Sequence, residues 1–227
     1  MSRSADTQPQ SAETILRVTE IYKSVQGEST WAGLPCIFVR LSGCPLRCVW
    51  CDTEYAFYGG EKLSVAAIVD QCRALGGDLI EITGGEPLAQ PECPDLAQAF
   101  LDAGFTVLIE TSGSLPISSL PAETIKIMDL KCPDSGEGDK NDWTNIDALT
   151  DRDEVKFVIA SRRDYEWSRE QVTKHNLSNR CKAALFSPVF GAIEGDSLVK
   201  WILEDKLNVR FQLQLHKYVW PPDAKGV

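Results

Sequence analysis

Residues 43–53 read GCPLRCVWCDT and hold three cysteines, Cys44, Cys48 and Cys51, with the spacing C-x3-C-x2-C. Three thiolates in one short loop, with no fourth ligand close by in sequence, suit a metal centre that keeps one coordination position open. A ligand or substrate can bind the metal through that position. The loop therefore predicts a metal centre with a chemical role.

The cysteine loop follows an apolar run, residues 35–41 (PCIFVRL), which is rich in residues that favour strands. Further strands are predicted over residues 78–83, 105–110, 125–130, 154–160, 182–186 and 209–213, and helices over 64–75, 94–103, 163–175 and 196–205. This alternation indicates a parallel sheet with right-handed crossovers, in which chemistry gathers where the strands end. Residues 133–145 are polar and are predicted to form a long surface loop.

The length and composition limit the fold and the partners. A full (β/α) barrel typically needs about 250 residues, and the chain has 227, so we expect an α/β fold with a partial or modified (β/α) TIM-type barrel. Residues 1–13 are polar and lack the apolar core of a signal peptide. We therefore expect a flexible tail over residues 1–13, one domain over residues 14–227 and a cytoplasmic location.

The charge and hydropathy of the chain exclude two classes of partner. The formal net charge is -10, which argues against broad nucleic-acid binding because that requires a basic surface. No apolar run is long enough to span a bilayer. The sequence thus predicts neither a nucleic-acid partner nor a membrane partner.

A structural zinc site is the alternative interpretation of the cysteine loop. Zinc usually takes four protein ligands, often as two C-x2-C pairs, whereas cysteine thiolates also hold iron–sulfur clusters. The other five cysteines have no paired spacing and are predicted to be structural thiols: Cys36, Cys72, Cys93, Cys132 and Cys181. The C-x3-C-x2-C spacing resembles that of radical S-adenosylmethionine enzymes, which implies a [4Fe–4S] cluster with one open iron. A zinc-stabilised binding module stays open as the rival.

A second motif, Thr83-Gly84-Gly85-Glu86-Pro87, follows a predicted strand. By itself it is typical of a tight turn, since glycine tolerates a positive φ. Together with the cysteine loop it resembles the motifs of the radical S-adenosylmethionine (SAM) superfamily. In that superfamily the glycine-rich backbone approaches the amino and carboxylate groups of SAM.

A longer resemblance covers the strings YKSVQGE at residues 22–28, IFVRLSGC at 37–44 and CVWCDT at 48–53. These strings are similar to the 7-carboxy-7-deazaguanine synthase family of radical SAM enzymes. The resemblance returns at residues 83–87 and is patchier through residues 129–131 and 214–218. It implies a lyase that converts 6-carboxy-5,6,7,8-tetrahydropterin to 7-carboxy-7-deazaguanine with release of ammonia. That reaction belongs to the biosynthesis of queuosine, a tRNA modification, or of related 7-deazapurines.

The resemblance also implies roles for individual residues. The ligands of the [4Fe–4S] cluster would be Cys44, Cys48 and Cys51, and Thr53 would help to hold Mg²⁺. Cofactor contacts with SAM would come from Gly85, Glu86, Ser112, Asp129, Leu130 and Lys131. Substrate contacts would come from Val25, Gln26, Gly27, Arg40 and Thr83. Arg40 would meet the substrate carboxylate, because a guanidinium fork suits that group.

The chain departs from the family pattern at two places. Asp129 and Leu130 stand where many members have Ser-Pro, and Ser29 stands where the family often has glycine. His216 and Lys217, near the end of the last predicted strand, either close the pocket or have a structural role.

The resemblance further implies an electron donor such as flavodoxin or ferredoxin and a homodimer, which would cover the open side of an incomplete barrel. A different radical enzyme, an activase that makes a glycyl radical on a protein partner, would share the cysteine loop and the GGEP motif. Such an activase would not need the turn at residues 26–28 or Arg40 at a strand end.

Overall fold

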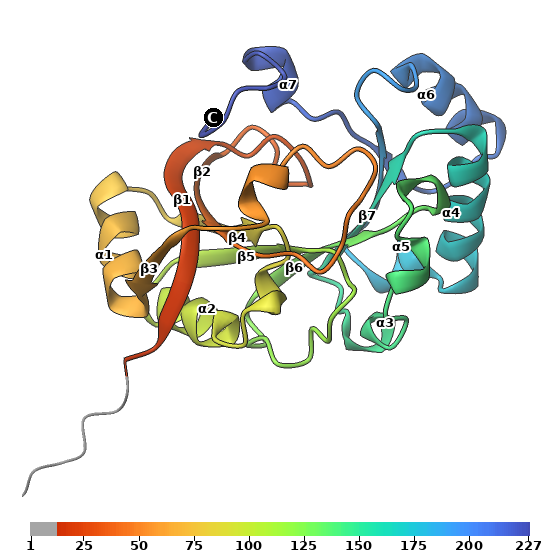
Figure 1. The fold of residues 1–227 in the computed structure, drawn as a ribbon. Coiled ribbons are helices and arrows are strands. Elements are labelled where there is room, and N and C mark those ends of the chain that lie inside the picture. The colour runs from red at the N-terminus through yellow and green to blue at the C-terminus, as the bar shows by residue number, and fades with distance from the viewer. Residues whose placement is uncertain (1–12) are drawn as a thin grey trace, which may run out of the picture.

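The computed structural model describes residues 13–227, so all of the predicted tail except Glu13 lies outside the described residues. One sheet runs through this part of the chain, in the strand order β3-β1-β2-β4-β5-β6-β7-β8-β9 (Figure 1). The strands are β1 (Ile15–Val25), β2 (Pro35–Leu41), β3 (Glu61–Ser64), β4 (Leu79–Gly84), β5 (Thr106–Thr111), β6 (Ile125–Leu130), β7 (Glu154–Ile159), β8 (Ala183–Pro188) and β9 (Arg210–Phe211).

The helices connect consecutive parallel strands or follow the last one. They are α1 (Val65–Leu75), α2 (Cys93–Asp102), α3 (Asn145–Ala148), α4 (Arg162–Lys174), α5 (Leu177–Arg180), α6 (Gly195–Glu204) and α7 (His216–Val219). Short 3-10 turns are η1 (Glu54–Ala56), η2 (Pro87–Ala89), η3 (Pro133–Ser135) and η4 (Gly138–Lys140). Among residues 13–227 no helix has the length and apolar character needed to cross a membrane.

The strands from β2 to β9 are parallel, and β1 is antiparallel to both of its neighbours, β2 and β3. The sheet ends at β3 on one side and at β9 on the other and does not close. The prediction of a partial or modified (β/α) barrel is therefore confirmed. In Figure 1, α7 and the C-terminus lie above one end of the strands, away from α2 and α3.

The sequence prediction missed β1 and β3 and made the last strand too long. In β1, Leu16 and Val18 are buried, but a bulge between Val18 and Glu20 interrupts the register with β2. A bulge changes the face toward which the following side chains point, so no single alternating pattern marks the strand. The predicted strand over 209–213 shrinks to β9, and His216 and Lys217 begin α7 and do not end a strand.

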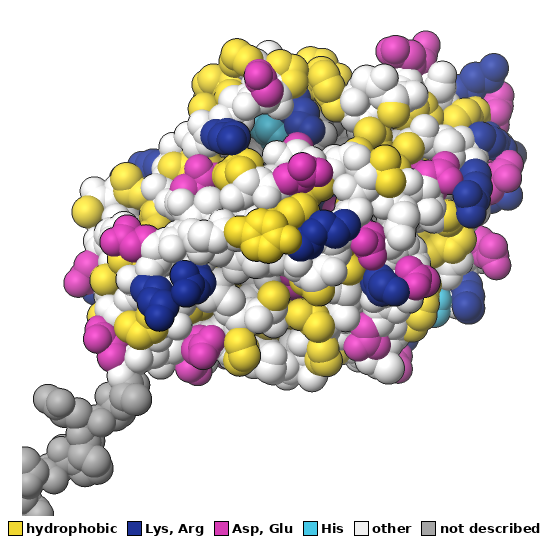
Figure 2. Space-filling view, viewed as in Figure 1, with side chains coloured by type: hydrophobic (Ala, Val, Ile, Leu, Met, Phe, Trp, Pro, Cys, Tyr) yellow, Lys and Arg dark blue, Asp and Glu magenta, His cyan; other side chains and the backbone are white. Residues whose placement is uncertain are grey.

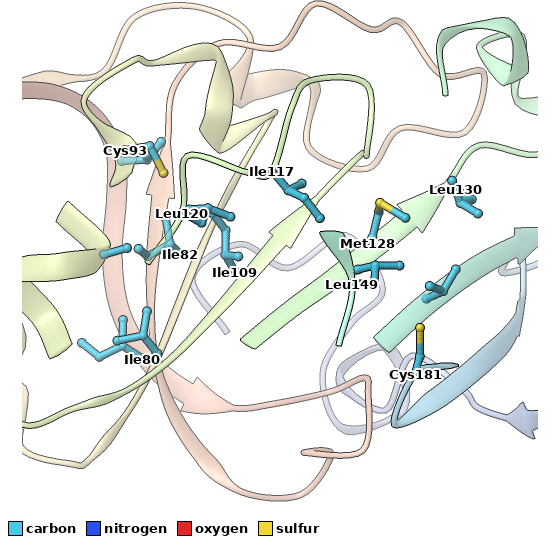
Figure 3. Close-up of a cluster of buried hydrophobic side chains, with 14 of the residues drawn as sticks. Ile80, Ile82, Cys93, Ile109, Ile117, Leu120, Met128, Leu130, Leu149 and Cys181 are labelled. Carbon is cyan, nitrogen blue, oxygen red and sulfur yellow. The ribbon is translucent and has the colours of Figure 1, made fainter. Parts of the chain in front are cut away.

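One face of the sheet packs against the helices and forms the main core. Buried apolar side chains from β4, β5 and β6, among them Ile82, Ile109 and Met128, belong to this core together with Cys93 from α2 (Figure 3). All five isolated cysteines are buried and free, as predicted. Burial raises the pKa of Cys181, which lies in this core, to about 12, so its thiol stays protonated and inert.

The other face of the sheet has two layers. A small apolar layer consists of Cys36, Phe38, Leu79, Leu108, Ile125 and Ile127. Polar side chains lie nearer the carboxyl ends of the strands. There the parallel register places Arg40 beside Thr83 and Asp129 beside Lys156. On the face in Figure 2, acidic and basic side chains are interspersed, without a broad basic surface.

Candidate active site

A cavity of about 560 Å³ lies at the carboxyl ends of the strands, where the sequence predicts the site. This volume is within the usual range for small-molecule sites. Nearly all of the predicted site residues line it: Val25, Gln26, Gly27, Arg40, Cys44, Cys48, Cys51, Thr53, Thr83, Gly85, Ser112, Asp129 and Lys131. Segments from residue 25 to residue 131 thus meet in one place.

The three loop cysteines differ from the other five, because they are half-buried and line the cavity. Burial raises the pKa of Cys48 to about 11, and the nearby Lys131 ammonium partly opposes this shift. Within residues 13–227, no three His, Cys, Asp or Glu side chains converge on the position of a single metal ion. Three thiols on one cavity wall are the donor set that an iron–sulfur cluster takes, with each thiolate on a different iron.

Residues 133–141 form a partly exposed loop that also braces the cysteine loop. The Val49 N–H donates to the Ser135 carbonyl at 3.0 Å, and the Arg47 N–H donates to Glu137 Oε1 at 2.6 Å. The same polar segment also holds Lys131, because Asn141 accepts from the Lys131 N–H and donates to its carbonyl. Within the segment, Ser135 and Asn141 also bond to the backbone carbonyls of Cys132 and Lys131.

The glycine-rich turn packs directly on the cysteine loop. The Glu86 N–H donates to the Gly43 carbonyl at 2.8 Å. A Cβ atom added to Gly85 would collide with that carbonyl oxygen and would lie 2.8 Å from Cys44 Cβ. Only glycine fits this approach, and the bare Gly85 backbone is left at the cavity wall.

Two predicted cofactor residues, Glu86 and Leu130, do not line the cavity. The Glu86 carboxylate is buried and accepts from the Ser112 N–H at 2.6 Å and from Thr111 Oγ1 at 2.9 Å. The Glu86 carboxylate therefore bonds to groups of the protein itself, and these bonds hold Ser112 at the cavity wall. The Leu130 side chain is fully buried in the main core.

A buried ion cluster, which the sequence prediction did not identify, lies at the cavity wall around Lys156. The Lys156 Nζ is 2.9 Å from Glu28 Oε2 and 3.6 Å from Asp129 Oδ2, and it also forms an ion pair with Glu110. Burial alone would lower the pKa of Lys156, but the Glu110, Glu28 and Asp129 carboxylates raise it well above its usual value. The signal in the sequence was a lysine within the apolar strand EVKFVI.

Asp129 keeps one acceptor for a ligand. Its Oδ2 lies 3.0 Å from Lys131 Nζ, whereas its buried Oδ1 has no hydrogen-bond partner in the described part of the chain. A buried, unsatisfied oxygen at a cavity wall suits a hydroxyl donor from a bound molecule. Together with the half-buried thiols and the Gly85 backbone, this oxygen makes a site that fits an iron–sulfur cluster and SAM.

Arg40 is held in place at the cavity wall by three groups. Its Nε donates to Glu20 Oε1 at 2.7 Å, Nη2 donates to the Tyr22 hydroxyl at 3.0 Å, and Nη1 donates to the Gly84 carbonyl at 3.2 Å. A guanidinium has five N–H donors, so two remain for a ligand. Thr53 makes no side-chain capping bond to η1, and its Oγ1 lies 3.7 Å from Cys51 Sγ at the cavity wall.

The turn at Gln26, Gly27 and Glu28 also lines the cavity and packs against α7. The Leu215 N–H donates to the Gly27 carbonyl at 2.9 Å, and a Cβ atom on Gly27 would collide with the His216 ring. His216 and Lys217 both line the cavity. Other lining residues that the sequence prediction did not identify are Tyr22, Phe38, Glu81, Val158, Val189 and Phe190.

The chain is similar to known radical SAM proteins over most of its length. The sequence profile described as the Radical SAM superfamily matches residues 38–174. The 7-carboxy-7-deazaguanine synthase of Koribacter versatilis is 47% identical, with 93% of this chain and all of the relative covered. The protein of the same name from Chlorobaculum tepidum is 43% identical, with 96% of this chain and all of the relative covered.

The fold is similar to that of a solved structure, the crystal structure of QueE from Escherichia coli. The TM-score is 0.74 at 23% sequence identity, over 89% of this chain and 95% of that one. The profile match and the identity to the relatives confirm the resemblance that the motifs carry. The chain belongs to the radical SAM superfamily and, within it, to the 7-carboxy-7-deazaguanine synthase family of enzymes.

Proposed function

We propose that this enzyme converts 6-carboxy-5,6,7,8-tetrahydropterin to 7-carboxy-7-deazaguanine with release of ammonia. The main observation behind this proposal is that a single cavity is lined by the three loop thiols, the Gly85 backbone, the turn at Gln26 and the guanidinium of Arg40. The names of the relatives support the same product. The product would enter the biosynthesis of queuosine or related 7-deazapurines, and the enzyme would act in the cytoplasm.

Cys44, Cys48 and Cys51 would hold the [4Fe–4S] cluster, and the Gly85 backbone, Ser112, Asp129 and Lys131 would surround SAM. When bound and reduced, the cluster and SAM supply a carbon radical able to take a hydrogen atom from the substrate. The protein's own contribution is orientation. Glu86 fixes Ser112 and Asn141 fixes Lys131, so both walls of the cofactor region are rigid before binding.

The remaining N–H groups of Arg40 would bind the substrate carboxylate, with Thr83 beside it in the parallel register. Gln26 and the backbone of Val25 and Gly27 would bind the pterin ring. The Thr53 hydroxyl would contribute to a Mg²⁺ site completed by substrate oxygens, since Mg²⁺ takes few protein ligands in such sites.

We further propose one catalytic domain over residues 14–227, with residues 1–13 as a tail. An electron donor such as flavodoxin or ferredoxin would serve the cluster. The short outer strands β3 and β9 leave both edges of the sheet open, and a homodimer would cover the open side.

The test is an anaerobic assay of the reconstituted protein with a reductant, SAM and the carboxypterin. We expect 7-carboxy-7-deazaguanine and ammonia in equal amounts, detected by mass spectrometry and by an ammonia assay. Mg²⁺ is added or chelated in parallel reactions. Cleavage of SAM without conversion of the carboxypterin would overturn the proposed substrate.

Replacing Arg40 by lysine tests the carboxylate contact. Lysine keeps the positive charge but loses the fork, so we expect KM for the carboxypterin to rise about 10- to 100-fold with a smaller change in kcat. Arg73→Lys is the matched control, because Arg73 is exposed on α1 and, within residues 13–227, pairs with Asp70 alone. An unchanged KM in Arg40→Lys would refute this contact.

Replacing Gly85 by alanine tests the approach of the glycine-rich turn to the cysteine loop. The new methyl group collides with the Gly43 carbonyl and crowds Cys44, so we expect iron and sulfide content and turnover to fall together, roughly 10-fold or more. Gly104→Ala is the control, since no atom of the described residues lies within 4 Å of a Cβ added to Gly104. Equal losses in the two variants would mean that general destabilisation, and not the collision with the cysteine loop, explains the effect.

A further inference from the structure

Glu81 is a carboxyl group in the apolar layer beneath the polar side chains of the cavity. It lies on β4 with 2% of its surface exposed, and its register partners on either side are Phe38 and Leu108. Both partners belong to the small apolar layer of this sheet face. Burying a carboxyl group there opposes folding unless something compensates it. The position therefore calls for a binding role.

The protein satisfies the Glu81 carboxyl group only in part. It accepts one hydrogen bond, from Gln26 Nε2, and residues 13–227 give it neither a second hydrogen bond nor an ion pair. Glu86, in contrast, has both carboxylate oxygens bonded, by Ser112 and Thr111. A carboxylate offers about four acceptor positions, so Glu81 retains acceptor capacity, and it lines the cavity.

The surroundings of Glu81 suit a flat ring. Tyr22 and Phe38 line the cavity beside it and stack with ring centroids 5.1 Å apart at 14°. The Gln26 amide is fixed at both ends, because its Oε1 accepts from the Glu28 N–H at 2.9 Å and its Nε2 donates to Glu81. The aromatic rings can pack against a planar heterocycle, while the fixed Gln26 and Glu81 side chains hydrogen-bond to its edge.

Glu81 also lies one layer below the proposed carboxylate site. Thr83 is two residues further along β4 and pairs with Arg40, as Glu81 pairs with Phe38. Two residues of strand span roughly 7 Å, which is comparable with the long dimension of a two-ring heterocycle. A ring whose carboxylate meets Arg40 would thus have its far edge beside Glu81.

We propose that Glu81 binds the 2-amino and N3–H edge of the pterin and so selects a 2-amino-4-oxopyrimidine ring over a ring with a carbonyl at position 2. Two neighbouring N–H donors match the two oxygens of a carboxylate. This inference rests on the proposed function. Burial and the nearby Glu110 raise the pKa of Glu81 well above its usual value, whereas N–H donors from a ligand favour the ionised form.

The test compares kcat/KM for 6-carboxy-5,6,7,8-tetrahydropterin and its 2-oxo analogue, 6-carboxy-5,6,7,8-tetrahydrolumazine, in the wild-type enzyme and in Glu81→Gln. The amide of glutamine has an N–H that can face a carbonyl. We expect the pterin value to fall about 10- to 100-fold in the variant, mainly through KM, while the lumazine value holds or rises. The preference for pterin then falls by at least the same factor.

Glu154→Gln is the matched control, because Glu154 is also buried in the sheet but bonds to Thr30 and does not line the cavity. Its substrate preference should equal that of the wild type. Equal losses for both substrates in Glu81→Gln overturn the inference, because a structural role predicts them. Failure of the wild-type enzyme to convert the carboxypterin overturns the proposed function and this inference together.

If Glu81→Gln does not fold, Glu81→Asp is the second variant that tests the inference. The shorter carboxylate should keep the preference for pterin but raise KM for it about 10-fold, because it reaches the ring edge poorly. A wild-type KM in Glu81→Asp would overturn the inference.

Discussion

A Cys44→Ala enzyme is expected to lose turnover of the carboxypterin by at least about 1,000-fold. Enzymes typically accelerate reactions by a million-fold or more, and here that acceleration depends on a group that the three loop thiols would hold. Cys44 lies at the point where the cysteine loop meets the Gly85 backbone. Its loss therefore removes a thiolate ligand and loosens the wall next to it.

The measurements are iron and sulfide content, visible absorption of the anaerobic protein, and product formation. Cys181→Ala is the matched control, because Cys181 is a free, buried thiol in the main core. We expect it to keep its iron and its turnover and to lose only about 1 kcal/mol of stability. A Cys44→Ala protein with normal iron and turnover, or a wild-type protein that holds zinc without sulfide, would refute the cluster.

The sequence was sufficient for the central parallel strands and for the local motifs. The predicted strand over residues 125–130 coincides with β6, because four of its six residues are apolar and a strand buried on both faces favours apolar residues at successive positions. The C-x3-C-x2-C loop and the GGEP turn were recognisable because their residues lie close together in the chain. The half-buried strand β1 was missed, because its bulge interrupts the alternation of apolar and polar residues.

The sequence did not reveal the roles of residues whose partners are set by the register between strands. Lys156 and Glu81 are single charged residues in apolar strands, and nothing in the neighbouring sequence names their partners. The segment over 133–145 is a polar loop with short 3-10 turns, as its composition indicates. Its hydrogen bonds to the cysteine loop were not predictable, because they join residues about 90 positions apart in the chain.

Replacing Lys156 by methionine should destabilise the folded enzyme by about 3–5 kcal/mol, because it leaves buried carboxylates without their cation. The melting temperature should fall by roughly 6–20 °C for a domain of this size. Methionine fills a similar volume, so the loss of charge dominates. Lys200→Met is the matched control, since Lys200 is exposed on α6 and lies 3.9 Å from Glu204, and we expect less than about 0.5 kcal/mol there.

The pH dependence separates the ion cluster from simple packing. Burial by itself would raise the pKa of Glu28, but Lys156 and the hydrogen bond from Gln214 lower it to about 2. A carboxyl whose pKa is lowered on folding stabilises the native state above its unfolded pKa, and that stability is lost as the pH falls through the folded value. The difference in unfolding free energy between wild type and Lys156→Met should therefore be greatest near pH 7 and shrink between about pH 4.5 and 2. A difference that is constant with pH, or no larger than that of Lys200→Met, would mean that Lys156 stabilises the cavity wall through packing and not through charge.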